Sequence, residues 1–273
     1  MEPRFPAHLF AGTIDDYVRH RIPYPEPLIR DLLARVSAAG NGMLVDLGCG
    51  PGRLTFRLAP HFARVVACDL EPGMIAAAKA ESERRGFRHI QWEAGLAETL
   101  EIPAGSVDLV TVGEAFHRLN QEVVVPLISR WLRPGGALAT AGSYVLADRS
   151  LPWQRAVLEV VDALVRPTGN ATNPPSALMG PEHDEGIFRA AGFTEVASHP
   201  FLLNHVWTAE GIIGYLHSTS FASRARLGPK TDAFDEAVRR ALEPFLVDGG
   251  ITDTIQFGYT FARWPESRVS RDK

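Results

Sequence analysis

The chain has 273 residues, a net charge of −4, 45% hydrophobic residues and 22% charged residues, a composition typical of a globular protein with a large core. Lys and Arg form no block and no apolar run approaches the roughly 20 residues that cross a bilayer, so we expect no nucleic-acid partner and no membrane span. Two cysteines make no disulfide framework and the N-terminus lacks a signal-peptide pattern, so a cytoplasmic protein is expected.

Helical and strand patterns alternate through the first 145 residues. Helices are predicted over 25–38, 53–59, 73–85 and 121–132, and strands over 43–47, 65–69, 89–93, 107–112 and 137–144. Strands that alternate with helices are typical of an α/β fold, in which a parallel sheet carries helices on both faces. Ligands of such sheets bind at the carboxyl ends of the strands.

The alternation ends near residue 145. Helices are then predicted over 151–166, 182–191, 208–222 and 230–246, and long strands over 193–207 and 252–264. The two strands fit an antiparallel edge pair that completes a seven-stranded sheet. We expect a single domain over 1–273, with an N-terminal helical lid at 1–38 and a helical cap inserted at 145–185, to which 208–232 contributes.

The most informative stretch joins the first strand to the next helix. Asp46 belongs to the apolar run, and Gly48, Gly50 and Gly52 follow at alternate positions. Glycine lets the backbone turn sharply and approach a ligand closely, and the first N–H groups of the next helix favour an anionic group. A dinucleotide fingerprint would place its third glycine at position 53, which is Arg53, so the spacing argues against NAD or FAD. A tight turn without a ligand is the alternative.

A second acidic residue, Asp69, ends the second strand. Its carboxylate could accept hydrogen bonds from both hydroxyls of a ribose, although a lone Asp more often caps a helix. Leu70 and Met74 follow at the strand end and the first helical turn, where they could sandwich an adenine ring; a plain core position is the alternative for Met74. His117, after the fourth strand, is the one candidate for a general base, with a structural histidine as an equal alternative. No residues have metal-ligand spacing, so no metal site is predicted.

The stretch from Asp46 to Gly52 resembles the first motif of class I S-adenosylmethionine-dependent methyltransferases, which holds the methionine end of the cofactor. Segments similar to the type 11, or trans-aconitate methyltransferase-like, group occur at 17–25, 114–120, 132–136 and 215–220. Arg118 stands where that group has tryptophan, which implies a different acceptor pocket.

This resemblance implies a Rossmann-like sheet of seven strands with S-adenosyl-L-methionine as the cofactor. It implies that Tyr17 and Arg21 close over the methionine end, that Leu96 and Ala97 lie beside the adenine, and that Gly113 and Glu114 border the sulfonium and the acceptor. The expected function is methyl transfer to a small-molecule acceptor, with an O, N or C nucleophile. The alternatives are a cofactor-binding protein that catalyses a non-methylating reaction, such as a cyclisation, and a regulatory module without chemistry.

Overall fold

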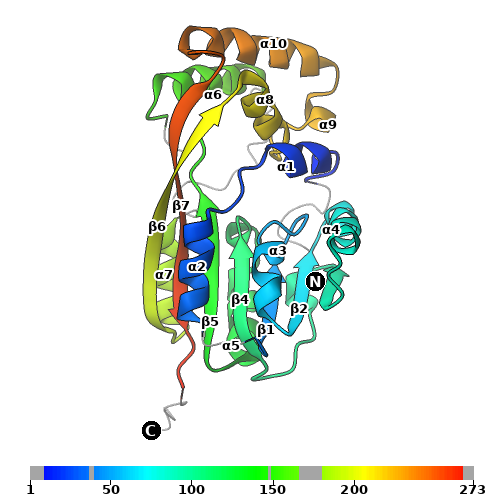
Figure 1. The fold of residues 1–273 in the computed structure, drawn as a ribbon, viewed down its shortest axis with the longest axis vertical. Helices are drawn as coiled ribbons and strands as arrows, with labels where there is room; N and C mark the ends of the chain where they lie inside the picture. Colours follow the sequence, from blue (N-terminus) through cyan, green and yellow to red (C-terminus); the bar gives the residue numbers. More distant parts are fainter. Residues whose placement is uncertain (1–8, 37–39, 147–148, 166–179, 267–273) are drawn as a thin grey trace.

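The computed structural model describes residues 9–36, 40–146, 149–165 and 180–266. Its strands form one seven-stranded sheet in the order β3-β2-β1-β4-β5-β7-β6 (Figure 1). The strands are β1 (Met43–Leu47), β2 (Arg64–Asp69), β3 (Ile90–Ala94), β4 (Val107–Gly113), β5 (Leu132–Ser143), β6 (Thr194–Trp207) and β7 (Ile251–Arg263). Pairs from β3 to β5 are parallel, and β7 runs antiparallel to both of its neighbours. The α/β class and the antiparallel late pair are confirmed.

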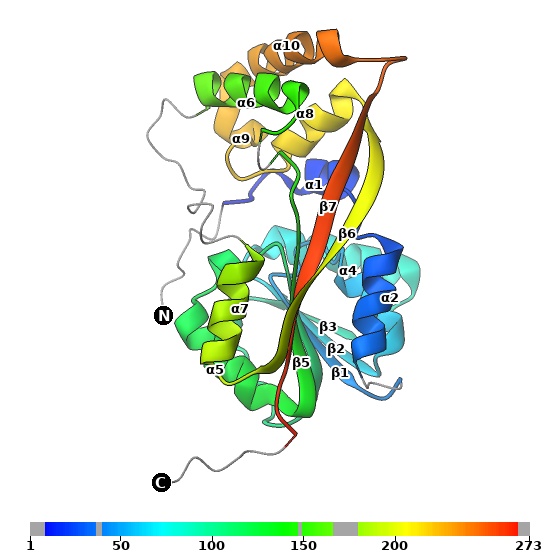
Figure 2. The ribbon, with the colours of Figure 1, turned by 90° about the vertical axis from the view of Figure 1, so that its left-hand side faces the viewer.

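Helices cover both faces of the sheet because alternate side chains of its buried strands point to opposite sides. Figure 2 shows α2 (Glu26–Arg35) and α4 (Pro72–Arg85) on one face and α5 (Gln121–Trp131) and α7 (Pro181–Ala190) on the other. The short helix α3 (Thr55–Leu58) packs against α2. Leu44 of β1 belongs to the same apolar cluster as Leu32 of α2, whereas its neighbour Val45 belongs to the cluster of Ile128 in α5. Every residue of β1 is therefore buried.

The two late strands extend beyond the carboxyl end of β5. Ser143, the last residue of β5, pairs with Phe257, whereas β7 begins at Ile251, opposite Trp207 of β6. The first part of β7 thus pairs with β6 alone and forms a two-stranded arm. This arm leads to a layer of helices above the strand ends: α6 (Pro152–Leu164), α8 (Ala209–His217), α9 (Arg224–Leu227) and α10 (Thr231–Leu242). We call these four helices the helical layer.

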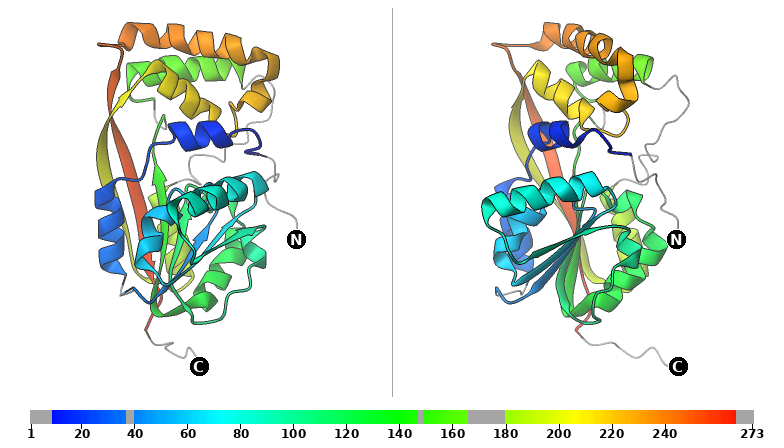
Figure 3. Two further views of the ribbon diagram at one scale, coloured as in Figure 1. Left: turned by 45° about the vertical axis from the view of Figure 1, so that its right-hand side comes forward. Right: turned by 90° about the vertical axis from the view of Figure 1, so that its right-hand side faces the viewer.

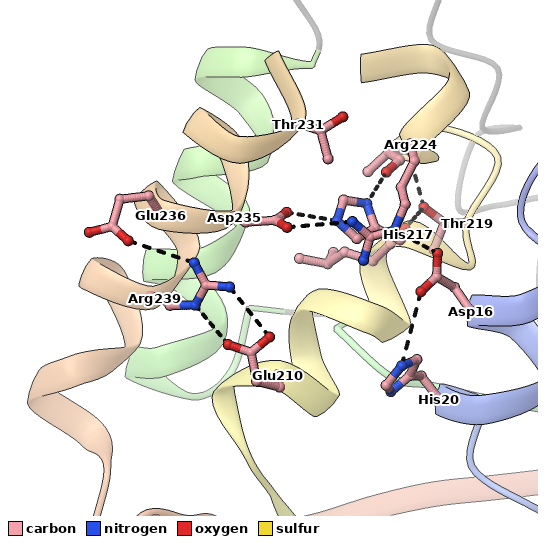
Figure 4. Close-up of polar contacts among 12 residues, drawn as sticks. Asp16, His20, Glu210, His217, Thr219, Arg224, Thr231, Asp235, Glu236 and Arg239 are labelled. Atoms are coloured by element: carbon pink, nitrogen blue, oxygen red, sulfur yellow. Dashed lines mark hydrogen bonds and ion pairs between the residues drawn. The ribbon is translucent and has the colours of Figure 1, made fainter. Parts of the chain in front are cut away.

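The helix α1 (Ile14–His20) lies between the helical layer and the sheet, next to α8 and α4 (Figure 3). Arg224 links it to this layer (Figure 4): its Nε lies 3.1 Å from Asp16 of α1, and its Nη1 lies 3.6 Å from Asp235 of α10. Asp235 in turn lies 2.7 Å from Nε2 of the fully buried His217. No helix in the described parts of the chain is long and apolar enough to cross a bilayer.

The structure differs from the predicted elements at several boundaries. The helix expected over 208–222 ends at His217, because the hydroxyls of Ser218 and Thr219 bond back to carbonyl groups of α8. The fifth strand begins at Leu132, which already pairs with Val107 before the register shifts. The helix expected over 25–38 ends at Arg35, and its residues 37 and 38 lie outside the described ranges.

Only part of the segment expected as a cap joins the helical layer. Of residues 145–185, α6 packs on α10, whereas α7, which starts at Pro181, packs on β6 and β7 at the sheet. Residues 166–179 of this segment lie outside the described ranges. The helical layer therefore consists of α6 and the connection between β6 and β7.

Candidate cofactor site

A cavity lies at the carboxyl ends of the parallel strands, beside α1. Ten of the residues predicted for the cofactor line it: Tyr17, Gly48, Gly50, Asp69, Leu70, Met74, Leu96, Ala97, Gly113 and Glu114. Four further lining residues with aromatic or charged side chains were not among the predicted cofactor residues, namely Phe10, Glu71, Glu98 and Arg118. The predicted residues Arg21, Asp46, Gly52 and His117 are not part of its wall.

The glycine loop serves two different purposes. Gly48 has a φ of 62°, and a Cβ at this position would lie 2.4 Å from the Cβ of Ala115. Gly50 has a φ of 54°, but the atoms nearest to its Cβ would be those of the Tyr17 ring at 4.0 Å. Both backbones require the left-handed region that glycine favours. Gly48 therefore allows close packing inside the protein, whereas Gly50 leaves space in the cavity.

Asp46 supports the loop from within the core. It is fully buried, and its carboxylate accepts hydrogen bonds from Thr55 Oγ1 at 2.5 Å and Thr111 Oγ1 at 2.7 Å. Burial raises the pKa of Asp46 to about 6, although both hydroxyls oppose the shift. This carboxylate thus joins β1 to α3 and β4, and its oxygens point to protein hydroxyls rather than to the cavity.

Asp69 holds the loop against the end of β2. Its Oδ2 accepts the N–H of Gly50 at 2.8 Å, and its Oδ1 accepts the N–H of Glu71 at 2.9 Å. Burial raises the pKa of Asp69 above its usual value, while these two backbone donors oppose the rise. Each oxygen keeps one lone pair that could accept a ligand hydroxyl.

Arg21 forms a bridge at the end of the cavity that Glu114 lines. It donates to Ser218 Oγ at 2.8 Å and to Glu114 Oε2 at 3.1 Å. Its guanidinium lies 4.8 Å from the ring centroids of both Tyr17 and Tyr215. Arg21 therefore joins the end of β4 to the end of α8, and its donors point to protein acceptors.

Glu114 follows β4 in a strained backbone conformation. Its φ is 54°, which is uncommon for a residue with a side chain and is typical of functional sites. Its Oε1 accepts a hydrogen bond from Ser143 Oγ at 2.5 Å. Burial would raise the pKa of Glu114, but the charges of Arg21 and Arg53, with the Ser143 bond, hold it below its usual value. Glu114 is therefore a partly buried, charged carboxylate.

The turn after β4 presents Arg118 rather than His117 to the cavity. Both belong to a short 3-10 helix, η3 (Phe116–Arg118). The guanidinium of Arg118 lies 4.8 Å from the ring centroid of Phe10, and its Nη2 lies 3.4 Å from Ser220 Oγ. Burial lowers the pKa of Arg118 to about 10. The one sequence signal for this residue was its place in a motif that otherwise carries tryptophan.

The charges on the cavity wall favour a cationic ligand. Among the described lining residues, Asp69, Glu71, Glu98 and Glu114 are acidic and Arg118 is basic. A sulfonium and an ammonium group are stabilised by such a surface, whereas a pyrophosphate is repelled. The space at Gly50, the acidic wall and the apolar Leu70 together fit S-adenosylmethionine better than a dinucleotide. In the described parts of the chain, no three His, Cys, Asp or Glu residues form a group that could hold a metal ion.

Comparison with known proteins agrees with this fit. The family model described as "Methyltransferase domain" matches residues 44–136. An uncharacterized methyltransferase of Mycobacterium tuberculosis is 28% identical over 85% of both chains. The nocamycin O-methyltransferase of Saccharothrix syringae is 28% identical over 89% of this chain and 92% of its own. The structure of a putative type II methyltransferase from Anaeromyxobacter dehalogenans superposes with a TM-score of 0.59 and 25% identity, covering 90% of this chain and 98% of the other.

The sheet order and the glycine loop at the ends of β1 and β2 define a Rossmann-like nucleoside-binding fold. With the matching domain and the methyltransferase relatives, the chain is a class I S-adenosylmethionine-dependent methyltransferase. Its cofactor is S-adenosyl-L-methionine.

Proposed function

We propose that this enzyme methylates a small organic molecule held between the sheet and the helical layer. The observation that carries the proposal is the cover over the methyl-transfer end of the cavity, where Arg21 joins Glu114 to Ser218 beneath α8. A macromolecular acceptor needs an open approach to this end, whereas a small molecule can be enclosed. The name of one relative, nocamycin O-methyltransferase, denotes a small-molecule acceptor and supports the same class.

In this proposal, the cofactor lies along the lined cavity from Gly113 to Leu96. Gly48, Gly50, Gly113 and Glu114 border its methionine end, and Tyr17 closes over it. Asp69 accepts hydrogen bonds from the ribose, while Leu70, Met74, Leu96 and Ala97 surround the adenine. Arg21 is a positioning residue, because it fixes Glu114 and α1 without lining the cavity. Asp46 likewise acts through the loop that it supports.

In this proposal, methyl transfer depends more on the alignment of the acceptor with the methyl group than on a general base. When bound, the cofactor supplies an electrophilic methyl group on a sulfonium. Holding the acceptor in line with that methyl group can contribute on the order of 7–11 kcal/mol to lowering the barrier. The Arg21 bridge, which joins the ends of α1 and α8 to Glu114, covers this end of the cavity. His117 lies outside the cavity wall, so the proposal assigns it no proton transfer.

The test is an acceptor screen that follows the methyl group. The protein is incubated with S-adenosylmethionine carrying a deuterated methyl and with pools of small metabolites, and mass spectrometry detects S-adenosylhomocysteine and labelled products. Parallel reactions contain oligonucleotides or unfolded protein as acceptors. Labelled small molecules support the proposal. Label found only in a macromolecule refutes it, as does an acceptor that is rearranged without label, the outcome expected of a cyclase.

A further inference from the structure

A residue that lines the cavity has one buried carboxylate oxygen without a hydrogen-bond partner among the described residues. Glu71 lies two residues after Asp69 and lines the same cavity. Its Oε1 accepts the N–H of Gly73 at 3.4 Å and so caps the N-terminus of α4. Its Oε2 is buried and accepts no hydrogen bond from any residue in the described ranges.

A buried carboxylate oxygen of this kind needs a hydrogen-bond donor. Nearly all buried polar atoms of native proteins are hydrogen-bonded, and a buried acceptor without a partner destabilises the folded state. The helix α1 packs on the N-terminus of α4 next to Glu71, since a Cβ placed on Gly73 would lie 2.7 Å from Cδ1 of Ile14. Because the residues that the structure describes offer this oxygen no donor, the donor should come from what fills the cavity.

Asp69 can offer a diol one lone pair on each of its two oxygens. Each of its two oxygens already accepts one backbone N–H, from Gly50 or Glu71. Glu71 Oε2 keeps both lone pairs. The two carboxylates are close enough that the charge of Glu71 adds to the burial that raises the pKa of Asp69. A pair of hydroxyl donors between them would relieve both the repulsion and the unpaired acceptor.

We propose that Glu71 is a second ribose ligand of this enzyme: with the cofactor bound, its Oε2 accepts a hydrogen bond from one ribose hydroxyl while Asp69 accepts one from the other. The inference rests on the proposed placement of the ribose at Asp69. It does not depend on the acceptor, because S-adenosylhomocysteine binding can be measured without one.

The test variant is Glu71→Ser. Serine is a strong helix N-cap, so α4 keeps its cap, but the side chain is too short to replace Oε2. Calorimetry with S-adenosylhomocysteine should show a dissociation constant raised about 10- to 100-fold, the range for a lost hydrogen bond to a charged group. Glu83→Ser, on the exposed side of the same helix, is the matched control and should bind like the wild type.

Deoxy analogues of the ligand identify the group that Glu71 contacts. The wild type should bind either the 2′-deoxy or the 3′-deoxy form of S-adenosylhomocysteine more weakly than the parent, and Glu71→Ser should bind that form as well as the parent. Equal affinity of Glu71→Ser and wild type for the parent would overturn the proposal, as would the same deoxy penalty in both proteins. If Glu71→Ser does not fold, Glu71→Thr, which is also an N-cap residue with a side chain too short to replace Oε2, tests the same prediction. Failure of the acceptor screen would leave these binding results intact.

Discussion

Replacing Gly50 with alanine would separate the space that the cofactor needs from the packing that the protein needs. At a φ of 54°, a residue with a Cβ is strained by about 1–2 kcal/mol. The new Cβ would meet no protein atom closer than the Tyr17 ring at 4.0 Å, and both residues line the cavity. Gly50→Ala should therefore fold, with its free energy of unfolding lowered by about 1–2 kcal/mol.

The added methyl group would occupy space on the ligand side of the loop. Overpacking of a close contact costs typically about 1–3 kcal/mol, which corresponds to a dissociation constant raised about 5- to 150-fold. Calorimetry with S-adenosylhomocysteine measures this change, and urea unfolding measures the stability.

Gly48→Ala is the matched control for this experiment. Its φ of 62° gives similar strain, but its Cβ would lie 2.4 Å from the Cβ of Ala115, inside the protein. Its loss of stability should therefore exceed that of Gly50→Ala. Wild-type affinity in a folded Gly50→Ala protein would refute the assignment of this loop to the cofactor.

Three further variants test the neighbouring features. Burial raises the pKa of Asp46 to about 6, so the wild type loses stability as the pH rises from about 4 to 6 and this carboxylate becomes charged. Relative to the wild type, Asp46→Asn should gain up to about 3 kcal/mol in free energy of unfolding across that window, measured by urea unfolding. A stability difference that does not change with pH would contradict the buried charge as its cause. Once an acceptor is known, His117→Ala should keep its turnover within about tenfold, whereas a loss of about 10²–10⁴ together with the acidic limb of the pH profile would restore His117 as a general base. Arg224→Ala removes partly exposed ion pairs, so the free energy of unfolding should change by less than about 1 kcal/mol. Hydrogen exchange of the backbone amides in α1 should become faster. An unchanged exchange rate would show that other contacts hold α1 in place.

The strands of the sheet were predictable because their signal is local. A strand buried on both faces is a continuous apolar run, and β1 was located to the residue. The helix boundaries were less predictable where side chains end a helix by bonding to its own carbonyls, as Ser218 and Thr219 do after α8. The pairing of Leu132 with Val107 was not predicted either, because the Pro-Gly-Gly sequence that follows Leu132 indicates a turn. That pairing depends on a neighbouring strand rather than on the local sequence.

In the candidate site, too, local patterns were predictable and long-range contacts were not. By itself, the sequence determined the class of ligand, because the glycine spacing and Asp69 are local patterns set by backbone conformation. Only the tertiary structure decided which side chains reach the cavity. Arg21 bonds Ser218, 197 positions away, and so is removed from the wall on which the motif had placed it. The turn after β4 brings Arg118 instead of His117 to the cavity wall, and the folded chain buries Glu71 Oε2 without a partner among the described residues. Such contacts depend on segments that meet only in the folded chain, and no local propensity encodes them.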